Sequence, residues 1–96
     1  MTTKNGFPKR SLSQNELILF DAVKEVVELR KKAIGTGIIY AKSWEIEDEL
    51  VEKREPLCIT TMKSPHRKQV ITWCLKSLGF QRRGKHIWKP LWVMEV

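Results

Sequence analysis

The chain has 96 residues, of which 42% are hydrophobic and 30% charged, and its formal net charge is +7. This length fits one domain with a modest core, and this composition excludes a disordered chain. No apolar run reaches the roughly 18 residues of a membrane span. The basic N-terminus lacks the apolar stretch of a signal peptide, so we expect an intracellular protein without a membrane partner.

Residues 1–12 contain three basic side chains and little to bury, and we expect a flexible basic arm before a folded domain over residues 13–96. Ser13 and Glu16 have the spacing of a capping box, which predicts the start of a helix. Gly35 is expected to end this helix. Apolar residues recur near the helical period and predict a buried face of Leu19, Phe20, Val23, Val26, Val27 and Ala33.

The next segment, residues 37–42, is rich in β-branched and aromatic residues and predicts a short strand. Ser43 is the expected cap of a second helix, which ends near Arg54 because Pro56 disfavours helical geometry in the residue before it. Residues 55–63 then form a connector. The expected buried positions of this helix are Ile46, Leu50 and Val51. Its acids predict a solvated face of Glu45, Glu47, Asp48, Glu49 and Glu52.

A third helix is marked by Ser64 as its N-cap, Pro65 at its first position and Gly79 as its end. Its predicted buried stripe is Ile71, Cys74, Leu75 and Leu78, and the residues predicted to point outward are Gln69, Thr72 and Lys76. Trp73 lies at the edge of the outward face. We expect it to pack against a neighbouring helix or the tail, with base stacking or a dimer interface as alternatives.

After Gly79 the pattern changes to that of strands. Two short β-prone runs, residues 80–82 and 86–88, flank a glycine-containing turn and predict a hairpin. The C-terminal residues, Leu91 to Val96, are too apolar to remain unpacked, and we expect them to contact the domain or a partner.

The order of these elements resembles the winged helix-turn-helix family over roughly residues 13–89. The likeness is strongest from Ser64 to Trp88, where a helix ending in a Leu-Gly-Phe step runs into a basic tip and an Ile-Trp pair. A similar ending occurs in winged modules of phage and plasmid replication proteins. The resemblance implies an α+β fold with three helices, a short strand and a C-terminal β-hairpin wing. Residues 64–78 would be the recognition helix, lying in the major groove, and residues 80–88 the wing.

The charge is sorted along the chain. From Lys63 to Lys89 there are eight basic residues and no acidic one, whereas residues 16–55 contain ten acidic and seven basic residues. Such a one-sided distribution favours a polyanion, most often a phosphate backbone. Glutamine and arginine can each bond a base edge twice, which suits Gln69 and Arg67. The expected DNA contacts are Lys63, Ser64, His66, Arg67, Lys68, Gln69, Thr72, Lys76, Arg82, Arg83, Lys85 and Lys89.

Other kinds of site find little support in the sequence. The histidines and cysteines lack the close pairs of zinc sites, and no triad spacing or phosphate-binding glycine loop occurs. We therefore expect no enzyme activity, no metal and no cofactor. For Cys58 and Cys74 we expect two half-buried thiols, with a disulfide between them as the alternative.

The sequence predicts a sequence-specific binder of double-stranded DNA that regulates transcription. The first helix or the tail from Leu91 to Val96 could form a homodimer interface. Two alternatives remain open. One is a winged module that binds an acidic protein partner. The other is a replication accessory that prefers single-stranded or junction DNA, in which Trp73 or Trp88 stacks on bases.

Overall fold

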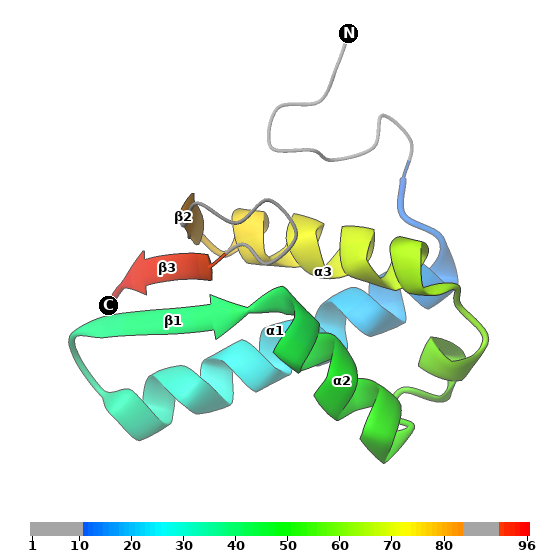
Figure 1. Ribbon diagram of the computed structural model, residues 1–96, viewed down its shortest axis with the longest axis horizontal. Coiled ribbons are helices and arrows are strands. Elements are labelled where there is room, and N and C mark those ends of the chain that lie inside the picture. Colours follow the sequence, from blue (N-terminus) through cyan, green and yellow to red (C-terminus); the bar gives the residue numbers. More distant parts are fainter. Residues whose placement is uncertain (1–10, 84–90) are drawn as a thin grey trace, which may run out of the picture.

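Figure 1 shows the computed structural model of the chain, in which residues 11–83 and 91–96 are described. The described residues form an α+β fold of three helices and a three-stranded antiparallel sheet, a layout compatible with a winged helix. The elements are α1 (Gln14–Ile34), β1 (Ile38–Lys42), α2 (Ser43–Lys53), the 3₁₀ helix η2 (Leu57–Thr60), α3 (Ser64–Ser77), β2 (Gln81–Arg83) and β3 (Leu91–Glu95). Of the expected basic arm, residues 1–10 lie outside the described part.

Helix α1 begins and ends where the sequence predicts. Ser13 Oγ accepts a hydrogen bond from the Glu16 N–H, and the Ser13 N–H donates to Glu16 Oε1 at 2.7 Å, so both halves of the capping box are present. Gly35 follows the helix with a φ of 81°, a conformation that only glycine adopts at little cost.

The buried face of α1 is shorter than predicted. Leu19, Val23 and Val27 are fully buried, and Phe20 and Val26 are partly so. Ala33 is exposed, and its predicted burial is wrong, because its neighbours in the last turn of α1 are also exposed. The end of the helix extends past the core.

Strand β3 lies in the centre of the sheet, between β1 and β2, and pairs antiparallel with both. The first strand of the predicted hairpin is present as β2, which pairs with β3, so that Arg82 lies opposite Trp92. The predicted second strand, residues 86–88, lies outside the described part. The C-terminal tail does pack on the domain, as one of the two alternatives predicted.

Burial of Trp92 explains this register. Its side chain is 1% exposed and lies on the core side of the sheet, level with Ala41 on β1. A strand that pairs on both edges and buries an indole is strongly stabilised.

The starts of α2 and α3 each differ by one residue from the prediction. Lys42 and Lys63 are the N-cap residues, and neither provides a side-chain cap. Ser43 and Ser64 are instead the first helical residues. The Ser64 hydroxyl donates to the buried Glu47 carboxylate and so joins the start of α3 to α2.

Helix α3 lies at the centre of the packing and contacts both α1 and α2. Its buried residues include the predicted Ile71, Cys74 and Leu75. Trp73 is 4% exposed, which confirms that it packs in the core. Gly79 ends this part of the chain with a φ of 97° and directs it into β2.

Candidate nucleic-acid interface

The solvent side of α3 carries one polar and basic stripe, made of Lys68, Gln69, Thr72 and Lys76, which we call the outer stripe. The spacings of three and four residues bring these side chains to one face. Lys68 and Gln69 are exposed, and Thr72 and Lys76 are half-buried. The predicted outward orientation is thus confirmed most clearly for Gln69. Lys63, also exposed, immediately precedes the helix.

His66, at the start of α3, directs one ring nitrogen toward α1, and 42% of its side chain is exposed. Its Nε2 lies 2.6 Å from Oε2 of Glu16, a carboxylate on α1 that is fully buried. A carboxylate only accepts hydrogen bonds, so Nε2 carries the proton in this contact. The other oxygen of Glu16 accepts the N–H of Ser13 in the capping box. One buried carboxylate therefore caps α1 and anchors α3.

Arg67 is anchored in the same way to α2. Its Nε donates to Oε2 of Glu47 at 2.9 Å, and only 18% of the Arg67 side chain is exposed. Its Nη1 donates to the backbone carbonyls of Ile59, at 3.2 Å, and of Met62. The guanidinium thus joins α2, α3 and the connector between them, and the hydroxyl of Ser64 completes the bonds to Glu47.

Three of the predicted DNA contacts, Ser64, His66 and Arg67, bond to the protein's own carboxylates. The atoms in these bonds are not available to bases or phosphates while α3 keeps this position. The predicted acidic face is corrected at one position, because Glu47 is 4% exposed and not solvated. The sequence gives a signal for the capping role of Glu16, but none for its second contact.

The two arginines of β2 diverge. Along a strand successive side chains point to opposite faces of the sheet. Arg82 lies opposite the buried Trp92, whereas Arg83 shares the outer face with Gln81. Arg82 and Arg83 therefore point to opposite faces of the sheet.

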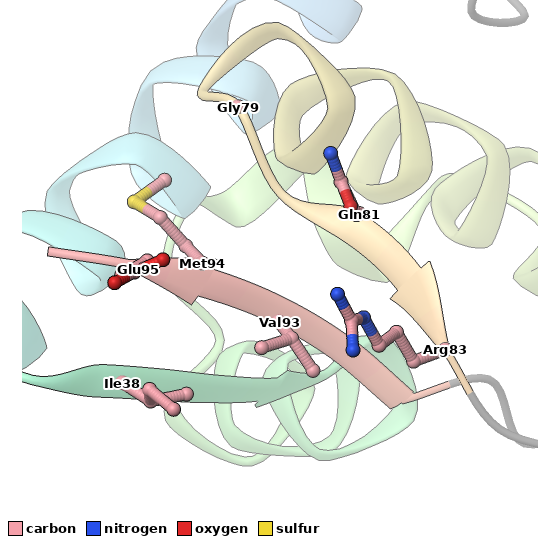
Figure 2. Close-up of a pocket in the computed structure, with 7 residues that line it drawn as sticks. All are labelled: Ile38, Gly79, Gln81, Arg83, Val93, Met94 and Glu95. Atoms are coloured by element: carbon pink, nitrogen blue, oxygen red, sulfur yellow. The ribbon is translucent and has the colours of Figure 1, made fainter.

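Figure 2 shows Arg83 and Gln81 at a hollow of about 330 Å³ on the outer face of the sheet. The hollow is open to solvent. The carboxylate of Glu95 and the side chains of Ile38 and Val93 also line it, together with Gly79 and Met94. The lining thus combines a cation, Arg83 on β2, with an anion, Glu95 on β3.

The remaining predicted residues fall into two groups. Arg82 and Arg83 are exposed, whereas Lys85 and Lys89 lie outside the described residues, as does Trp88. Within residues 11–83 and 91–96, no group of three or more histidine, cysteine, aspartate or glutamate side chains is placed to hold a metal ion.

Both cysteines are free thiols. Cys74 lies on the inner side of α3, where its Sγ donates to the carbonyl of Phe20 at 3.3 Å. Burial raises the pKa of the Cys74 thiol to about 12, with smaller and opposing effects from Lys24 and Asp21. Burial also raises the pKa of Cys58, although this residue is only half-buried.

Comparison of the chain with protein-family models, with curated proteins and with solved structures finds no match. In the described part of the chain, every helix is too short or too polar to cross a membrane.

Proposed function

We propose that this chain is a winged-helix domain that binds double-stranded DNA as a sequence-specific regulator, with α3 in the major groove and the hairpin of β2 and β3 as its wing. The observation that carries the proposal is the outer stripe. It presents two lysines, a glutamine and a threonine on the solvent side of a helix whose start is bonded to α1 and α2.

The chemistry of the outer stripe suits a groove. A major groove of about 12 Å admits one helix. Gln69 can bond an adenine edge in two places, and the methyl and hydroxyl groups of Thr72 suit thymine or phosphate. Lys68 and Lys76 lie toward opposite ends of the stripe, where phosphates of the two groove walls would approach them.

The distribution of charge supports the same orientation. No acidic residue occurs in residues 56–94, which include all of α3 and β2. The carboxylates of Glu16 and Glu47, which contact the start of α3, are buried and bonded to His66, Arg67 and Ser64. The exposed acids Asp21, Glu45 and Asp48 belong to α1 and α2. A polyanion would therefore approach α3 and avoid the other two helices.

The bonds that anchor the start of α3 to α1 and α2 would fix the angle at which this helix meets DNA. Recognition of bases needs a helix whose angle is fixed, because a small error in position loses paired hydrogen bonds. His66 and Arg67 fix that angle through Glu16 and Glu47, which lie on α1 and α2. They would thus act as positioning residues and not as contacts to DNA.

The proposal is tested by titrating labelled duplex DNA of random sequence at several salt concentrations and following fluorescence anisotropy. The variant K68A/K76A removes the two lysines of the outer stripe, and its matched control K24A/K42A removes two exposed lysines from α1 and β1. We expect K68A/K76A to bind about tenfold or more weakly and to lower the slope of log K against log salt by about 2. The control should bind like the unchanged chain.

Two results would contradict the proposal. One is the absence of binding to any duplex at low salt, which would favour an acidic protein partner. The other is equal loss of binding in both double variants, which would indicate a general attraction to cations. Tighter binding to single strands than to duplex would favour the replication alternative.

A further inference from the structure

Helix α1 carries a second apolar stripe beside its buried face. It consists of Ala22, Val26, Leu29 and Ala33, at alternating spacings of four and three residues. Leu29 is 61% exposed and Ala33 is exposed, whereas Ala22 and Val26 are half-buried. Alternating spacings of four and three are the pattern by which one helix packs along another.

This second stripe forms one wall of a groove of about 150 Å³ between α1 and the end of α2. The other wall includes Leu50, with the charged residues Lys53 and Glu55 at its rim. An apolar floor with a polar rim is typical of a surface that a partner covers.

The charges beside the stripe indicate which partner fits. Glu25 and Lys32 flank the stripe on the same side, seven residues apart, which is about 10 Å along the helix. They are therefore too far apart to pair with each other within one chain. Among the described residues neither has an ion pair, whereas Glu28 pairs with Lys31 at 3.7 Å further around the helix.

We propose that α1 pairs antiparallel with α1 of a second copy of this chain, about a twofold axis between Val27 and Glu28. This axis places Val26 opposite Leu29 of the second copy, and Ala22 opposite its Ala33. It also brings Glu25 toward Lys32 of the second copy, and the twofold axis repeats this ion pair. The stripe and its flanking charges are thus complementary to themselves.

The pairing goes beyond DNA binding and does not rest on it. All residues of the groove belong to α1, to α2 and to Glu55 after it, so the outer stripe of α3 stays uncovered. The overlapping part of α1 has only about two heptads. Such a small interface predicts a reversible dimer with a dissociation constant of roughly micromolar order.

Sedimentation velocity of the full chain over a range of concentrations tests the pairing at low salt. The unchanged chain should shift from monomer to dimer as its concentration rises. The single variants E25K and K32E each place like charges opposite each other, and we expect dimerisation to weaken at least about fivefold in each. The variant D48K changes an exposed acid of α2 outside the groove and should dimerise like the unchanged chain.

Mixing the two single variants provides the decisive measurement. A heterodimer of E25K with K32E has opposite charges at both contacts, so the mixture should dimerise more strongly than either variant alone. The double variant E25K/K32E should likewise dimerise by itself. Circular dichroism checks that every variant is folded.

The pairing is overturned if the unchanged chain stays monomeric, or if the single variants dimerise normally. It is also overturned if the mixture behaves like its separate components. A failure of the proposed DNA binding can be told apart from a failure of the pairing. K68A/K76A leaves the groove intact, so this variant should dimerise like the unchanged chain.

Discussion

Arg67 and Lys68 are neighbours in the sequence and equally basic, yet the structure gives them opposite surroundings. Arg67 is 18% exposed and bonded to Glu47, whereas Lys68 is exposed on the solvent side of the same helix. One step along a helix is a rotation of about 100°, which separates the two side chains. A run of basic residues therefore contains both cations that hold the fold and cations that remain for a partner.

The difference lies in where the carboxylates are. Glu16 and Glu47 come from two other helices and approach only the inner side of the start of α3. No carboxylate comes with α3 itself, because residues 56–94 contain none. His66 and Arg67 are thus bonded to carboxylates from distant parts of the sequence, whereas Lys68 and Lys76 have no ion pair among the described residues.

The largest effect on stability is expected from a substitution of Arg67, on the side of α3 that faces α1 and α2. The variant R67M leaves the buried Glu47 carboxylate with the Ser64 hydroxyl as its remaining partner among the described residues, and it removes the donor to two backbone carbonyls. We expect the free energy of unfolding to fall by about 3 kcal/mol. Urea unfolding followed by tryptophan fluorescence measures this change.

The double variant E47M/R67M separates the ion pair from the packing of the two stems. Removing both charges leaves no unpaired carboxylate, so we expect the double variant to be more stable than R67M. If the free energies of unfolding of R67M and of the unchanged chain differ by less than about 0.5 kcal/mol, Arg67 does not anchor α3.

A smaller effect on stability is expected when the pH rises and the buried thiol of Cys74 ionises. The pKa of its thiol is raised to about 12 from an ordinary value of 9.0, because burial disfavours the thiolate. The unfolded thiol ionises first as the pH rises, so this contribution to stability is complete below pH 9 and is lost between pH 9 and about 12. At a pH of roughly 10.5 this ionisation should lower the free energy of unfolding by about 2 kcal/mol.

The variant C74A provides the control for this pH dependence. It lacks the thiol, so its stability should fall less steeply than that of the unchanged chain above pH 9. Equal slopes for the two chains would show that Cys74 ionises as readily in the folded state as in the unfolded one.

The sequence predicts the helices well because their signals are local. The capping box of Ser13 and Glu16, the glycine at position 35 and the period of apolar residues in α3 all act within a few residues of the chain. The outer stripe follows from the same period. These parts of the fold and of the candidate site need no knowledge of distant contacts.

The contacts that the sequence does not predict are the distant ones. His66 bonds a carboxylate 50 positions away, and Arg67 bonds one 20 positions away. The register of β2 likewise depends on Trp92 and on pairing of β3 with β1. Local propensity contains no information about these partners, so it predicts neither the bonds of His66 and Arg67 to carboxylates nor the pairing of β2 with β3.

The smallest effect on stability is expected on the outer side of α3, from the variant K68A/K76A. Neither lysine has an ion pair among the described residues, and alanine has a high helix propensity, so little is lost when both stems are removed. We expect the free energy of unfolding to change by less than about 0.5 kcal/mol. Urea unfolding under the conditions used for R67M gives a direct comparison. A fall in stability as large as that of R67M would mean that the two lysines stabilise the fold. Weaker DNA binding by K68A/K76A would then follow from a destabilised α3 and not from lost contacts to DNA. An unchanged stability with weakened DNA binding would separate the two sides of α3 by function.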